Sequence, residues 1–174
     1  MKKAHSFRIF ALLMVLSLTI TGISICGGKA LAAGNKSTDF KSFDEVKEYW
    51  AKRENPDKNF HVEGYSYVKI KTKSGMKKAL FILYSKTGFY KTNVYIENSG
   101  KILYHKYDGS IGYYSASRQY LSFYAYACTG IYKYNKNKGI YKSYSEADDP
   151  DVMSEGTKLR KKYGCTNRIK YKSL

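Results

Sequence analysis

The fold is decided by residues 79–144, which read ALFILYSKTGFYKTNVYIENSGKILYHKYDGSIGYYSASRQYLSFYAYACTGIYKYNKNKGIYKSY. Short apolar runs rich in tyrosine are separated about every eight to twelve residues by Gly, Asn, Asp or Ser. Strands of this length need only tight turns between them, so the spacing is typical of an antiparallel meander. We therefore predict a mainly β (α+β) fold, with about seven short strands, one N-terminal amphipathic helix and a short C-terminal helix.

Upstream of this stretch, residues 61–73 alternate apolar and polar side chains as a half-buried strand does. Lys69, Lys71 and Lys73 share the polar face, where they could bind a polyanion or keep the strand from pairing with another chain. Residues 79–84 (ALFILY) are continuously apolar. They predict a central strand covered on both faces, with the N-terminal helix on one side.

Local signals mark the helices and one turn. Residues 42–45 (SFDE) form a capping box, which predicts a helix start. Apolar residues follow at helical spacing up to Trp50, which we expect in the core rather than as a sugar-stacking platform. Asp149-Pro150 and the basic residues 158–162 predict the second helix. Asp108-Gly109 predicts a two-residue hairpin.

The first 32 residues have the layout of a secretory signal peptide. A basic start precedes an apolar run over residues 9–25, and Ala30-Leu31-Ala32 predicts cleavage after Ala32. The alternative of a lipoprotein signal ending at Cys26 is disfavoured, because the bulky Ile25 precedes that cysteine. An uncleaved membrane span is disfavoured because the run is short for a bilayer. We predict a secreted, extracellular or cell-wall associated protein with no transmembrane segment after cleavage.

The remaining chain is predicted to consist of a spacer, residues 33–41, and a single β-rich domain, residues 42–174. It contains two cysteines, Cys128 and Cys165. In an oxidising compartment two cysteines favour one disulfide, which would close a loop of roughly 36 residues. A reactive thiol is the alternative, but neither cysteine has an adjacent histidine or a C-x-x-C spacing.

The chain carries a net charge of +17. Without the signal, 27 basic and 14 acidic residues remain, a net charge of +13. This exceeds the magnitude of about 2 to 8 usual for a small soluble domain, which favours an anionic partner over a role in solubility alone. The candidate polyanion-binding residues are Lys69, Lys71, Lys73, Lys133 and Lys142. The candidate stacking residues are Tyr120, Tyr124 and Tyr126, which we expect on one face of a strand.

No catalytic or metal-binding pattern stands out. The acidic residues Glu146, Asp148, Asp149, Asp151 and Glu155 lack the glycine of a calcium loop, and helix capping explains them better. Neither histidine after the signal has a carboxylate or cysteine at a diagnostic spacing. We therefore predict a protein that is not an enzyme, has no cofactor or metal, and binds no specific nucleic acid.

Residues 77–84 (KKALFILY), followed by Val94-Tyr95-Ile96 and Gly100-Lys101-Ile102, resemble a degenerate FG-GAP/VCBS-like repeat of uncharacterised secreted Gram-positive bacterial proteins. Such repeats typically carry a D-x-D-x-D-G calcium loop, where this chain has residues 71–75 (KTKSG), so no metal residue is carried over. The resemblance implies a noncatalytic extracellular β domain. Our hypothesis is a secreted domain associating with anionic cell-envelope polymers; the alternative is a secreted effector, an antibacterial toxin or an enzyme inhibitor.

Overall fold

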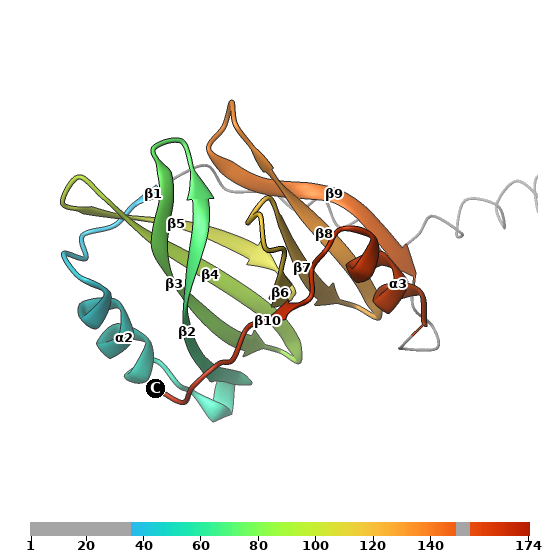
Figure 1. Ribbon diagram of the computed structural model, residues 1–174. Helices are drawn as coiled ribbons and strands as arrows, with labels where there is room; N and C mark the ends of the chain where they lie inside the picture. The colour runs from blue at the N-terminus through green and yellow to red at the C-terminus, as the bar shows by residue number, and fades with distance from the viewer. Residues whose placement is uncertain (1–35, 149–153) are drawn as a thin grey trace, which may run out of the picture.

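The computed structural model describes residues 36–148 and 154–174. Its strands form two five-stranded antiparallel sheets, β1-β5-β4-β3-β2 and β10-β6-β7-β8-β9, which lie side by side in Figure 1. The elements are β1 (Lys36–Ser37), α2 (Phe43–Ala51), the 3-10 helix η1 (Pro56–Lys58), β2 (Phe60–Thr72), β3 (Gly75–Lys86), β4 (Phe89–Asn98), β5 (Lys101–Asp108), β6 (Ser110–Tyr114), β7 (Tyr120–Ala125), β8 (Cys128–Asn135), β9 (Ile140–Asp148), α3 (Ser154–Lys162) and β10 (Asn167–Arg168). The predicted mainly β class with two short helices is confirmed, although the strands divide between two sheets.

Strand β3 lies inside the first sheet, between β2 and β4, and is covered on both faces as predicted, but the middle strand of the five is β4. Leu80, Phe81 and Ile82 are fully buried, since apolar groups cover both faces of the strand. Phe81 belongs to the core between the two sheets, while Leu80 and Ile82 pack with α2 on the outer face. The predicted spacer contributes β1 to the same sheet, and Thr38 donates from its N–H and its hydroxyl to the Ile102 carbonyl.

Helix α2 begins at the predicted capping box. The Ser42 hydroxyl accepts from the Glu45 N–H at 3.2 Å, and the Glu45 carboxylate accepts from the Lys41 N–H at 2.7 Å. The helix buries Val46 and Trp50 against the first sheet. The Trp50 indole donates to the Tyr95 hydroxyl at 2.8 Å, so the prediction that Trp50 belongs to the core is confirmed.

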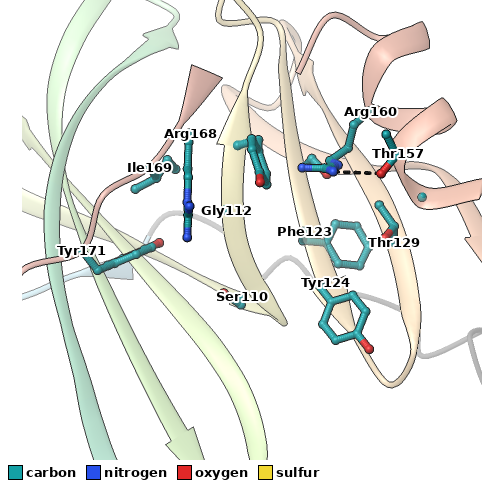
Figure 2. A pocket seen from close by; sticks show the side chains of 13 residues that line it. Ser110, Gly112, Phe123, Tyr124, Thr129, Thr157, Arg160, Arg168, Ile169 and Tyr171 are labelled. Atoms are coloured by element: carbon teal, nitrogen blue, oxygen red, sulfur yellow. Dashed lines mark hydrogen bonds between the residues drawn. The ribbon is translucent and has the colours of Figure 1, made fainter. Parts of the chain in front are cut away.

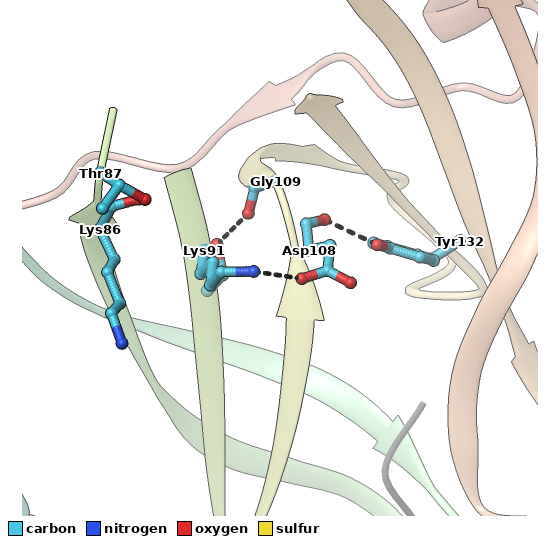
Figure 3. Close-up of polar contacts among 7 residues, drawn as sticks. Lys86, Thr87, Lys91, Asp108, Gly109 and Tyr132 are labelled. Carbon is cyan, nitrogen blue, oxygen red and sulfur yellow. Dashed lines mark hydrogen bonds and ion pairs between the residues drawn. The ribbon is translucent and has the colours of Figure 1, made fainter. Parts of the chain in front are cut away.

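The predicted hairpin at Asp108-Gly109 is wrong, because the chain passes there from the first sheet to the second. β5 pairs with β4, whereas β6 pairs with β7 and β10. Gly109 has a φ of +91°, which favours glycine. The Asp108 carboxylate pairs with Lys91 at 2.7 Å and its carbonyl accepts from the Tyr132 hydroxyl at 2.8 Å (Figure 3). These contacts hold the junction against both sheets.

The C-terminal segment connects the edges of the two sheets. In Figure 1 it runs from α3 across β6 toward α2. β10 pairs with β6, and Lys172 exchanges two backbone hydrogen bonds of 2.8 Å with Tyr65 of β2. A Cβ on Gly64 would lie 2.4 Å from the Lys172 carbonyl oxygen, so glycine is required for this close approach.

The expected Cys128–Cys165 disulfide is not formed, because Cys165 has a free, buried thiol. Burial raises the pKa of this thiol to about 11. The ring of Tyr163, two residues earlier, contacts Tyr120, whose partner on β8 is Lys133. Lys133 is five positions from Cys128, or about 16 Å along a strand. The chain after α3 therefore lies near the Lys133 end of β8 and not near Cys128 at its start. A disulfide needs Cα atoms about 4.4 to 6.8 Å apart.

Tyrosines fill much of the core, which predicts a loss of stability at alkaline pH. Burial raises the pKa of five tyrosines far above the ordinary value, namely Tyr84, Tyr107, Tyr132, Tyr141 and Tyr171. Unfolded tyrosines lose their protons near pH 10, whereas these native ones keep them. We expect a free energy of unfolding that is constant up to about pH 9 and falls above about pH 10, measured by urea unfolding. Full tyrosinate absorbance in the still folded protein would contradict this expectation.

Candidate anion-binding site

The strongest candidate site lies between α3 and the second sheet. Helix α3 packs on β8 and β9, and the chain turns after its end at Gly164, which has a φ of +64°. Arg160, Lys161 and Lys162 occupy its last turn, where positive charge complements the helix dipole. Because Ser122 and Tyr124 alternate along β7 with the core residues Leu121 and Phe123, they face toward the helix.

Between these elements is a cavity of about 360 Å³, which we call the arginine pocket (Figure 2). Its side chains come from β6, β7, β8, α3 and the C-terminal segment. Two arginines, Arg160 and Arg168, line it together with the hydroxyl-bearing residues Ser110, Tyr113, Ser122, Tyr124, Thr129, Thr157 and Tyr171. No carboxylate is among the described lining residues, so the pocket combines positive charge with neutral hydrogen-bonding groups.

Arg160 is oriented by two neighbours within this pocket. Its guanidinium lies over the ring of Tyr113, 4.0 Å from the centroid, and Nη2 donates to the Thr157 hydroxyl at 3.1 Å. Figure 2 shows this hydrogen bond on the wall formed by α3. Within residues 36–148 and 154–174, Arg160 forms no ion pair with an acid. The remaining guanidinium donors can therefore bind an anion, in the forked geometry that suits phosphate and carboxylate.

A second basic surface lies on the same sheet. Lys133 lies over the ring of Tyr144, 4.5 Å from the centroid, and beside Tyr120. Lys142 is directly opposite Lys133 in the β8–β9 ladder, although like charges in such pairs are destabilising. A hydrogen bond from Lys138 and its positive charge lower the pKa of Lys142. This concentration of like charge would be relieved by a bound anion.

The five lysines predicted to bind a polyanion are distributed over both sheets. Lys73 lies beyond β2, and its side chain lies beside Gly139 in the turn between β8 and β9. Lys69 lies in β2 of the other sheet, directly opposite Lys78 in the ladder. Lys71 is also in β2, where its N–H donates to the Tyr141 hydroxyl at 3.0 Å. Lys69 and Lys71 lie two apart in a regular part of the β2–β3 ladder and so share one face, while Lys73 lies past the end of the strand.

Of the three tyrosines predicted on one face of a strand, two lie in β7. Tyr124 lines the arginine pocket, and Tyr120 contacts Tyr144 and Tyr163 beside Lys133. Tyr126 lies outside β7 with a φ of +51°, in the turn before β8. Its ring packs 4.7 Å from that of Phe89 in the first sheet. The turn thus removes Tyr126 from the row.

Sequence reasoning missed both pocket arginines. Arg160 is in the basic segment predicted as a helix, but its register on the sheet is not visible in a charge pattern. Arg168 reaches the pocket because β10 pairs with β6, which lies more than fifty residues earlier in the chain. The only sequence signal that pointed to this pocket was the hydroxyl-rich outer face of β7.

Neither helix within residues 36–148 and 154–174 has the length and apolar character of a membrane span. Over these same residues, no three acidic, histidine or cysteine side chains group as metal ligands. Asp149 and Asp151 of the acidic run, the predicted cap at Asp149-Pro150 and the signal at residues 1–32 lie outside the described residues.

Comparison of the chain with family models, with curated proteins and with solved structures finds no match. The resemblance to FG-GAP/VCBS-like repeats stays a prediction. What the fold and site define is a tyrosine-rich protein of two β-sheets, with an arginine pocket under its C-terminal helix.

Proposed function

We propose that this protein is a secreted, noncatalytic β-rich domain that binds anionic cell-envelope polymers through the arginine pocket. The observation that carries the proposal is the pair Arg160 and Arg168 in a hydroxyl-lined cavity that has no carboxylate from residues 36–148 or 154–174. Guanidinium groups and hydroxyls are the donors that phosphate accepts most readily in proteins. A phosphodiester polymer of the teichoic-acid type has this chemistry along its whole length.

The surrounding charge supports a polymer rather than a single small anion. Lys133 and Lys142 lie on the same sheet as the pocket, and the net charge of the chain is +17. One phosphate of a chain in the pocket would leave neighbouring phosphates free to contact these lysines. Binding is favoured over catalysis because the described residues that line the pocket include no histidine or carboxylate to act as a general acid or base. The proposed export depends on the signal layout of residues 1–32.

The Arg160→Gln variant should bind poly(glycerol phosphate) at least about tenfold more weakly than the parent, because charge-assisted hydrogen bonds are lost. Lys101→Gln is the matched control, since it removes one charge from an exposed position in the distant β4–β5 hairpin. It should change the affinity less than about twofold. The affinity of Arg160→Lys should lie between those of the two other variants, because lysine keeps the positive charge but lacks the paired donors of a guanidinium group.

Calorimetric titration at about 50 mM and about 150 mM salt would give these affinities, with thermal unfolding to confirm folding of each variant. Equal losses for Arg160→Gln and Lys101→Gln would mean that overall charge alone attracts the polymer. That result would exclude the arginine pocket as the binding site.

A further inference from the structure

A second cavity lies on the opposite side of the molecule, beside α2 on the outer face of the first sheet. Its volume is about 550 Å³, within the range of small-ligand sites. Seven aromatic residues line this aromatic cleft, namely Phe40, Tyr49, Trp50, Phe60, Tyr84, Tyr95 and Tyr104. Tyr104 stacks on Tyr95 at 5.7 Å, and Phe40 meets Tyr49 edge to face at 5.2 Å. The packing among these rings gives the cleft fixed, flat walls.

A buried, uncharged polar side chain of the cleft is Asn93 on β4. It is 6% exposed, and its Nδ2 donates to the Tyr95 hydroxyl at 3.3 Å. Trp50 donates to the same hydroxyl at 2.8 Å, so the tyrosine oxygen is fixed between two donors. The Oδ1 atom of Asn93 has no hydrogen-bond partner within the described residues. A buried acceptor without a donor is costly, and a donor from a ligand would remove that cost.

The charge around the cleft is positive. Arg53, Lys86 and Lys106 line it with one acid, Asp39. The Arg53 guanidinium lies over the Tyr49 ring and donates to the Tyr49 hydroxyl. Lys86 and Lys106 form no ion pair in the part of the chain that the structure describes. Lys106 is directly opposite Asn93 in the β4–β5 ladder, so its ammonium group lies on the same face.

We infer that the aromatic cleft binds a pyranose ring that carries a carboxylate, such as a hexuronic acid unit of an acidic glycan. Aromatic side chains present apolar faces to the C–H groups of such a ring. A ring hydroxyl donates to Asn93 Oδ1, and the carboxylate pairs with Lys106 at the rim. This site is separate from the arginine pocket, and the inference does not depend on the proposed function.

The chain contains a single tryptophan, and Trp50 lines the cleft, so its fluorescence reports binding directly. Titration with glucuronate should give a saturable change in emission, and glucose should bind at least about tenfold more weakly. Lys106→Gln should remove most of the preference for glucuronate over glucose. Asn93→Leu should weaken both sugars by about tenfold, because the acceptor is lost.

Lys101→Gln is the control for Lys106→Gln, since both positions are exposed lysines of β5. It should leave both titrations unchanged, and so should Arg160→Gln, which alters only the arginine pocket. No saturable change with glucuronate, equal binding of glucose, or retained preference in Lys106→Gln would each overturn the inference. Loss of glucuronate binding in Arg160→Gln would also overturn it, because the sugar acid would then occupy the other cavity. Since Lys106 is exposed, its variant keeps the test decisive even if Asn93→Leu fails to fold.

Discussion

Replacing Thr92 with valine is expected to lower the free energy of unfolding by about 2 to 4 kcal/mol, because two backbone groups lose their partner in the interior. Thr92 is fully buried where the chain passes between the sheets. Its hydroxyl donates to the Gly109 carbonyl at 2.9 Å and accepts from the Ile111 N–H at 3.1 Å. Valine keeps the shape of threonine but supplies neither interaction. Urea unfolding measures the loss.

Thr92→Ser is the matched control for this prediction. It keeps the hydroxyl and removes one methyl group, so it should cost only about 1 kcal/mol. If the serine variant were as unstable as the valine variant, the methyl group would matter more than the two hydrogen bonds. The junction at Gly109 would then depend on packing rather than on Thr92.

Replacing Gly130 with alanine should destabilise the protein by about 2 to 3 kcal/mol, through overpacking of the core. A Cβ at this position would lie 2.2 Å from the ring of Phe123, its partner across the β7–β8 ladder. The Phe123 ring stacks on Tyr132 at 4.2 Å, so it has little room to move away. Denaturant unfolding would measure the change.

The double variant Gly130→Ala/Phe123→Leu tests the mechanism, because a smaller side chain makes room for the new methyl group. The decrease in the free energy of unfolding of the double variant should be smaller, by at least about 1 kcal/mol, than the sum of the decreases in the two single variants. Strict additivity would show that Gly130 is needed for its backbone freedom rather than for the space above it.

Several elements were predictable because their signals are local. The capping box at residues 42–45 predicts the start of α2, and continuous apolarity over residues 79–84 predicts an interior strand covered on both faces. The Asp108-Gly109 signal was misleading because hairpin propensity describes only the turn. Contacts from other strands also act there: Thr92 of β4 bonds to the Gly109 carbonyl and the Ile111 N–H, where the chain enters the second sheet.

The binding sites were harder to predict, since each combines residues distant in the sequence. The arginine pocket needs β10 beside β6, and the aromatic cleft needs α2 beside β4 and β5. The β2 bulge between Val62 and Gly64 also interrupts the alternation that the sequence suggests. Tyrosine and lysine counts therefore indicate the kind of surface, but tertiary pairing decides which side chains share a site.

The central claim is that anionic polymer binds in the pocket under α3 and is not held by diffuse charge. Amide chemical-shift mapping during titration with poly(glycerol phosphate) tests it most directly, because it reports on every strand at once. We expect the largest shifts around Tyr113, Thr129, Thr157 and Arg160, with smaller ones near Lys133. Shifts spread evenly over the lysines of both sheets, with none at Arg160, would contradict the claim.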